Sequence, residues 1–149
     1  MSAQENKGLV SKAIEEVWNQ GNLEAVNRYF AELYVDHTPL PGQDPGPEGY
    51  KQAVALIRAA FPDLHLTLDD VIAEEDKVSF RYTMSGTHQG EFMGMTPTGR
   101  AFSVAGMIFA RAAEGKFTDR WAILDTMSLM QQLDVSAQAD THPSAEGAG

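Results

Sequence analysis

The chain has 149 residues, 43% of them hydrophobic, which is enough for one compact domain to bury most of the surface that the unfolded chain exposes. Its 11 Lys and Arg against 21 Asp and Glu leave a net charge of −10, so we expect neither nucleic acid nor an anionic membrane as a partner. The absence of cysteine excludes disulfides and Cys-ligated metals. Without a signal-peptide pattern or an apolar run of ~20 residues, the sequence predicts a cytoplasmic protein.

The first half of the chain predicts three helices. Apolar residues recur at steps of three and four over 9–18 and stop at the NQGN stretch of 19–22. A second, shorter helix is predicted from Asn22 to Phe30, and a loop rich in Pro and Gly covers 34–49. The third helix begins near Pro47 and ends at Phe61, because Pro62 disfavours α geometry in the residue before it.

In the second half of the chain the apolar period changes from helical spacing to two. Strands are predicted from Leu64 to the turn at 74–77, and then over 77–88, 101–112 and 116–127. Short connections favour an antiparallel, curved sheet with the helices on one face. We therefore predict an α+β cone, with a single domain over 1–134 and a flexible tail over 135–149.

The last predicted strand carries a carboxylate among residues that would otherwise fill a core. Alternation puts Phe117, Trp121 and Asp125 on one face, and we expect this aromatic face to point inward. Burial beside Trp121 would raise the pKa of Asp125 above its ordinary value of ~3.9, towards the range of a general acid or base. The alternative is structural, since an Asp at a strand end also caps a following helix, and the stretch 125–133 suits a helix start.

Two histidines are further candidates for polarising a substrate oxygen. His88 shares a strand face with Tyr82, so it either donates to a ligand or ties a turn to the strand. His37, beside Asp36 at the expected mouth of the cone, is either an acid/base partner or an exposed loop residue. The four histidines lack HExxH or HxH spacing, and no phosphate loop or GxSxG pattern occurs, so we expect no metal and no cofactor.

Large apolar side chains from several elements are expected to fill the core or to line a pocket for a small hydrophobic molecule. The stretch GEFMGM, residues 90–95, is a candidate lid over the mouth of that pocket. The predicted pocket residues are Trp18, Tyr34, Phe61, Tyr82, Phe92, Met107, Ile108 and Trp121.

Three motifs carry a resemblance to a known family. They are Gly86-Thr87-His88 with Gly90-Glu91, the MTPTG stretch of 95–99, and Trp121 with Asp125 before the QQL of 131–133. With them the chain resembles the SnoaL-like polyketide cyclases, or ester cyclases, over roughly residues 5–134. The resemblance implies a cone-shaped α+β barrel of the nuclear transport factor 2-like (cystatin-like) type, an apolar pocket, and copies that associate through the sheet into dimers or tetramers.

The resemblance also implies a reaction: an intramolecular aldol-type cyclisation of a small hydrophobic carbonyl compound, without metal or organic cofactor. The family's acid/base Asp on the last strand is matched here to Asp125. A Gln and a His that the family's aromatic cyclases carry on the preceding strand are replaced by Gly106 and Ile108. A non-catalytic carrier or sensor of a lipophilic metabolite, or a related isomerase or epoxide hydrolase, therefore stays an alternative.

Overall fold

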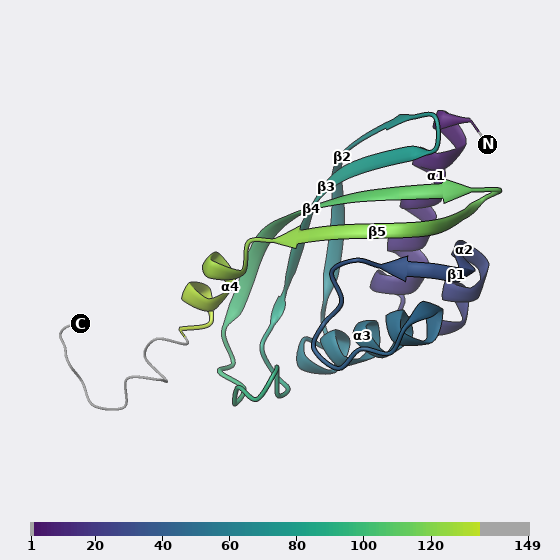
Figure 1. Cartoon of the computed structure of the whole chain (residues 1–149). Helices are drawn as coiled ribbons and strands as arrows, with labels where there is room; N and C mark the ends of the chain where they lie inside the picture. The colour runs from purple at the N-terminus through teal and green to yellow at the C-terminus, as the bar shows by residue number, and fades with distance from the viewer. Residues whose placement is uncertain (1, 135–149) are drawn as a thin grey trace.

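A five-stranded sheet with helices on one of its faces makes up the structure (Figure 1). This computed structural model describes residues 2–134, and the tail predicted over 135–149 lies outside the described residues. In chain order the elements are α1 (Ala3–Ala13), the π-helix η1 (Ile14–Asn19), the 3-10 helix η2 (Leu23–Ala25), α2 (Val26–Tyr29), β1 (Phe30–Asp36), α3 (Gly46–Ala60), β2 (His65–Glu74), β3 (Lys77–Thr87), β4 (Ala101–Ala113), β5 (Lys116–Leu124) and α4 (Thr126–Gln132).

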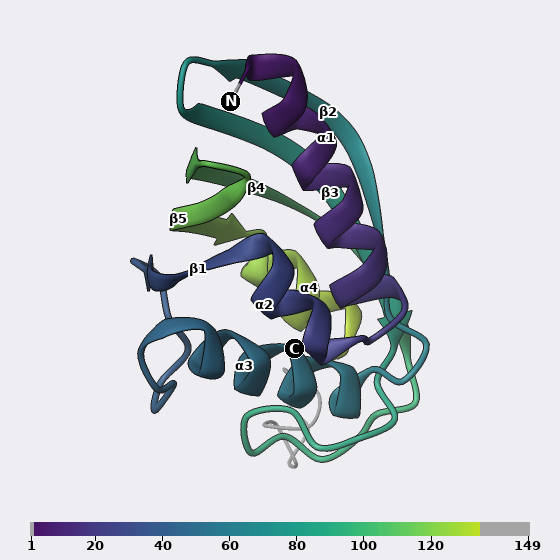
Figure 2. The ribbon, with the colours of Figure 1, turned by 90° about the vertical axis from the view of Figure 1, so that its right-hand side faces the viewer.

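The strands lie in the order β1-β5-β4-β3-β2, and every neighbouring pair is antiparallel except β1 with β5. Figure 2 shows α1, α2 and α3 together on one side of the curved sheet, while α4 follows the end of β5. The predicted α+β class, with helices packed on a mainly antiparallel sheet, is confirmed. The inner face of the sheet and the helices that cover it enclose the core.

Strand β1 occupies residues that the sequence pattern assigns to a helix end and a loop. Phe30 and Tyr34 are both buried and four residues apart, a spacing that fits one face of a strand as well as one face of a helix. The pairing of β1 with β5 is also irregular between Phe30 and Val35, so β1 lacks the regular ladder of the other strands. The sheet therefore has one more strand than predicted, and this strand lies parallel to β5 at the edge.

A bulge in β5 reverses the faces that its side chains occupy. Ala112 on β4 pairs with Phe117 and Arg111 pairs with Asp119, so Thr118 is an extra residue in the ladder. Because side chains alternate with a period of two, one extra residue moves every later side chain of the strand to the opposite face.

The bulge decides which β5 side chains reach the interior. Beyond it, Arg120, Ala122 and Leu124 line the space between sheet and helices, whereas Ile123 is 73% exposed on the outer face. Trp121 lies on the same outer face as Ile123. The prediction that Trp121 points inward together with Phe117 is therefore wrong.

Asp125 follows β5 and caps the short helix α4. Its carboxylate is exposed, and its Oδ1 accepts a hydrogen bond from the backbone N–H of Ser128 at 3.1 Å. The expected inward orientation of Asp125 is wrong for the same reason as that of Trp121, since both follow the bulge. This is the alternative role that the sequence analysis gives to Asp125, a cap on the helix that follows the strand.

Replacing Asp125 with alanine removes this cap and should lower the free energy of unfolding by about 1 kcal/mol. Asp125→Asn is the matched control, because asparagine caps helices about as well and should leave stability near the wild-type value. Urea unfolding followed by circular dichroism measures both. Equal losses in the two variants would contradict the capping role.

Candidate functional site

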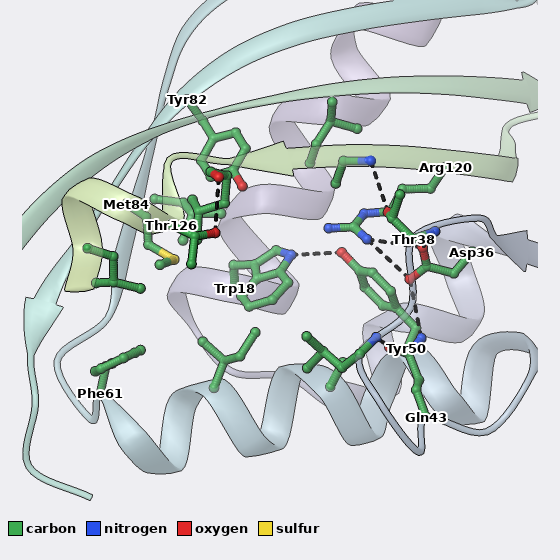
Figure 3. Close-up of a pocket in the computed structure, with 18 of the residues that line it drawn as sticks. Trp18, Asp36, Thr38, Gln43, Tyr50, Phe61, Tyr82, Met84, Arg120 and Thr126 are labelled. Atoms are coloured by element: carbon green, nitrogen blue, oxygen red, sulfur yellow. Dashed lines mark hydrogen bonds and ion pairs between the residues drawn. The ribbon is translucent and has the colours of Figure 1, made fainter. Parts of the chain in front are cut away.

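A cavity of about 290 Å³ lies between α3, η1 and the inner face of the sheet (Figure 3). Most of its wall is apolar, as is typical of sites for small organic ligands. Side chains from η1, α3, β2, β3, β4, β5 and α4 contribute to the wall. The predicted pocket residues that line it are Trp18, Phe61, Tyr82, Phe92 and Ile108.

Trp18 is positioned by the π-helix η1, which continues α1 with a wider turn. Asn19 fixes the end of η1 on β2, because its side chain donates to the carbonyl of Leu66 at 3.0 Å and accepts from the N–H of Leu66 at 2.7 Å. In the cavity, the indole N–H of Trp18 donates to the hydroxyl of Tyr50 at 2.8 Å. This hydrogen bond and an edge-on contact between the two rings hold the indole of Trp18 against α3 (Figure 3).

The charged part of the site is an ion pair between β5 and the end of β1. Nη1 of Arg120 lies 3.1 Å from Oδ2 and 3.3 Å from Oδ1 of Asp36, and the two residues are register partners in the parallel ladder. The side chains are only 17% and 7% exposed, respectively. The guanidinium also lies over the ring of Tyr50, with its Cζ 5.4 Å from the ring centroid.

Asp36 also organises the loop that follows β1. Its carboxylate accepts hydrogen bonds from the side-chain amide of Gln43 at 3.2 Å and from the backbone N–H of Thr38 at 3.1 Å. The hydroxyl of Thr38 in turn accepts from the N–H of Ala122 on β5 at 3.0 Å. The loop is therefore attached both to the ion pair and to the strand beside it.

Burial keeps the phenols around the pair neutral and leaves the guanidinium charged. Burial alone would lower the pKa of Arg120, but Tyr50, Tyr34 and Asp36 together raise it. Burial raises the pKa of Tyr50 and of Tyr82, so both hydroxyls stay protonated at neutral pH. The site thus offers one carboxylate, one guanidinium and neutral hydroxyls within an apolar wall, a set that suits a small apolar molecule carrying oxygen atoms.

His88 is fully buried but lies behind the cavity wall rather than in it. Its Nδ1 accepts from the N–H of Thr98 at 3.3 Å, and its backbone pairs with Arg100 and Gly99. The imidazole meets the ring of Phe61 edge-on at 5.7 Å. These contacts match the structural alternative, in which His88 ties a turn to the strand.

His37 lies on the outer face of the sheet, away from the cavity. Its ring stacks on Trp121 with centroids 4.2 Å apart, and its Nε2 lies 3.0 Å from Oδ2 of Asp119. The hydrogen bond to His37 is the largest cause that lowers the pKa of Asp119. The structure therefore brings His37 and Trp121 together, but separates both from Asp125, His88 and the cavity.

Two other predicted pocket residues also lie outside the cavity. Met107 is 57% exposed on the outer face of β4, because its neighbours Gly106 and Ile108 take the inner face. Tyr34 is buried, but its ring packs against Phe30 and Tyr50 beneath the wall. The placement of Met107 and Tyr34 in the pocket is therefore wrong.

The two ionised residues of the cavity, Asp36 and Arg120, were missed as site residues in the sequence. In the sequence Asp36 stands out only as a neighbour of His37, and uninterrupted alternation in β5 would place Arg120 on the face opposite Phe117. No periodic signal in the sequence marks Thr118 as the extra residue that turns Arg120 inward.

Within residues 2–134, no group of three or more His, Cys, Asp or Glu side chains is placed to hold a metal ion. No helix in this part of the chain is long and apolar enough to cross a membrane.

Comparisons with known proteins relate the sequence and the fold of this chain to one family. The family model described as SnoaL-like polyketide cyclase matches residues 8–133. Nogalonic acid methyl ester cyclase of Streptomyces nogalater is 30% identical over 133 residues, which cover 87% of this chain and 95% of the relative.

Two solved structures from Streptomyces extend the similarity to three dimensions. TsrD from Streptomyces laurentii superposes with a TM-score of 0.81 at 28% identity, covering 89% of this chain and 97% of TsrD. Wild-type IdmH from Streptomyces antibioticus gives 0.75 at 31% identity, covering 86% and 97% of the two chains. These matches span the helices, the sheet and the cavity between them, and the chain belongs to the SnoaL-like polyketide cyclase family.

Proposed function

We propose that the chain is a cofactor-independent cyclase that binds a small hydrophobic carbonyl compound in the cavity, with Asp36 and Arg120 as its acid/base and charge-stabilising groups. The observation that carries the proposal is the ion pair itself. Among the described residues that line the cavity, these two are the only ionised ones. Family membership supports the cyclase class, but the fold hosts several chemistries, so the residues must be argued from the site.

An intramolecular aldol step needs a base for a carbon-bound proton and a group that stabilises the enolate oxygen. In the proposed reaction a carboxylate oxygen of Asp36 takes the proton from the carbon next to a carbonyl, and the guanidinium of Arg120 stabilises the negative charge on that carbonyl oxygen. The nucleophilic carbon then forms a bond to a second carbonyl carbon of the same molecule. The resulting alkoxide takes up the proton held by Asp36, so the carboxylate is regenerated.

The experiment compares two carboxylates on one substrate panel. Nogalonic and aklanonic acid methyl esters, which relatives of this chain are named for cyclising, serve as test compounds. We expect Asp36→Asn to lower turnover by about 100-fold or more, as loss of a general base commonly does. Cyclised product is quantified by liquid chromatography with mass detection.

Asp125→Asn is the matched variant, because it removes a carboxylate while retaining a helix cap outside the cavity. It should turn over the same esters at close to the wild-type rate. A loss confined to Asp125→Asn would contradict the assignment to Asp36 and restore the acid/base role that the family resemblance gave to Asp125. Thermal unfolding of both variants separates loss of chemistry from loss of fold.

A second candidate, a carrier of a lipophilic carbonyl compound, is favoured by one specific observation. The oxygens of Asp36 already accept hydrogen bonds from Arg120, Gln43 and Thr38, which leaves the carboxylate few free positions for a proton. A carrier would bind the test esters with similar affinity in wild type and Asp36→Asn and convert them in neither.

We further propose that a second copy of the chain covers the outer face of the sheet. Apolar side chains stand exposed there on β1, β4 and β5: Leu33 is 88% exposed and Ile123 is 73% exposed, next to Val35, Met107 and Phe109. An exposed apolar face of this kind is typical of an interface. The family resemblance supports the same partner.

The double substitution Leu33→Lys with Ile123→Lys should convert a dimer or tetramer into monomers, because each change places a charge in the proposed interface. Met127→Lys is the control, since Met127 is also 75% exposed but lies on α4, outside this face. Analytical ultracentrifugation measures the masses. A monomeric wild type, or an oligomer that survives the double substitution, would contradict the interface.

A further inference from the structure

The ring of Tyr82 occupies space that only a glycine leaves free on the next strand. Tyr82 of β3 and Gly106 of β4 are register partners on the inner face of the sheet. A Cβ atom at position 106 would lie 2.4 Å from Cζ and 2.5 Å from Oη of Tyr82, well inside van der Waals contact. The phenol of Tyr82 therefore lies across the backbone of Gly106. Because Gly106 has no side chain, the Tyr82 hydroxyl can take this position.

The hydroxyl of Tyr82 reaches the cavity without a partner. Tyr82 is only 6% exposed and lines the cavity, yet no hydrogen bond joins its hydroxyl to another described residue. The oxygen is not one of the fully buried unpaired polar atoms, so it keeps access to the cavity, where a ligand can supply the missing partner. Burial also raises the pKa of the phenol, so it is a donor and not an anion throughout the neutral range.

The neighbours of this hydroxyl on the cavity wall are mainly apolar, and the nearby hydroxyl of Thr126 already donates to the carbonyl of Leu124 at 3.1 Å (Figure 3). Met84 and Ile108 flank it on the sheet, and Figure 3 shows Trp18 between Tyr82 on one side and the Asp36–Arg120 pair on the other. A ligand that lies along the indole would thus meet the charged pair at one end and a lone hydrogen-bond donor at the other. An oxygen at that second end is the group that satisfies the donor.

We propose that the hydroxyl of Tyr82, held in place by Gly106, donates a hydrogen bond to a carbonyl oxygen of the bound molecule and selects ligands that carry such an oxygen. The inference names the ligand class of the cavity, and it rests on the proposed function only for its place in a reaction. Recognition by Tyr82 would hold equally in a cyclase and in a carrier.

Two probes of one shape test the proposal without any turnover. Fluorene and 9-fluorenone share a three-ring frame and differ in one carbonyl oxygen, and their binding is followed by tryptophan fluorescence. In wild type, 9-fluorenone should bind more tightly than fluorene. In Tyr82→Phe the affinity for 9-fluorenone should fall by roughly 3- to 10-fold, the usual net effect of one neutral hydrogen bond, while that for fluorene stays unchanged.

Gly106→Ala provides an independent variant, because its methyl group displaces the phenol without removing the hydroxyl. It should reduce the preference for 9-fluorenone as Tyr82→Phe does, and the double variant should show no further loss of preference. Tyr29→Phe is the control, since this phenol bonds to Glu16 away from the cavity and its loss should not alter either affinity. Circular dichroism establishes that each variant is folded.

The outcomes separate this proposal from the proposed function. Equal losses for both probes in Tyr82→Phe would reduce Tyr82 to a packing role and overturn the inference, as would a wild type that shows no preference for 9-fluorenone or binds neither probe. A wild type that prefers 9-fluorenone but converts neither methyl ester would leave the recognition by Tyr82 intact and remove only the cyclase assignment.

Discussion

The ion pair between Arg120 and Asp36 is the interaction on which the site depends. It joins β5 to the end of β1, holds the following loop through Gln43 and Thr38, and places two opposite charges inside an apolar chamber. Each charge is tolerated there because the other is present, and removing one partner of such a buried pair typically costs about 3–5 kcal/mol. The parallel pairing of β1 with β5 makes the two residues register partners, so the position of the pair is a consequence of the sheet topology.

Much of the architecture could be read from the sequence, because it depends on patterns that local chemistry imposes. The apolar spacing of α1 and α3 and the alternation in β3 and β4 give the helices, the antiparallel strands and several wall residues, among them Trp18 and Phe61. The edge strand β1 and the orientation of the β5 side chains could not be predicted in this way, because apolar periodicity does not reveal a local irregularity such as a bulge. The spacing of Phe30 and Tyr34 in β1 fits a helix as well as a strand, and the extra Thr118 in β5 turns Arg120 inward and Trp121 outward.

The bulge in β5 also explains why Asp125 lies outside the cavity and why we propose Asp36 as the carboxylate of the site. The predicted inward orientation of Asp125 assumes that the strand alternates without interruption, and the bulge removes that assumption for everything after Thr118. Asp36 carries no signal of its own in the sequence, because its partner Arg120 lies more than eighty residues away and meets it only through the parallel edge strand. Contacts of this kind follow from topology, and periodicity in one segment does not encode them.

Side chains of strand β4 alternate between the cavity side and the outer face of the sheet. Gly106 and Ile108 turn towards the cavity side, whereas Met107 and Phe109 stand on the opposite face of the same strand. Neighbouring residues of β4 therefore determine separate properties: one set shapes the cavity, and the other sets the chemistry of the outer surface. A substitution at Ile108 can therefore alter the ligand fit of the cavity without changing the side chains that Met107 and Phe109 present on the outer face.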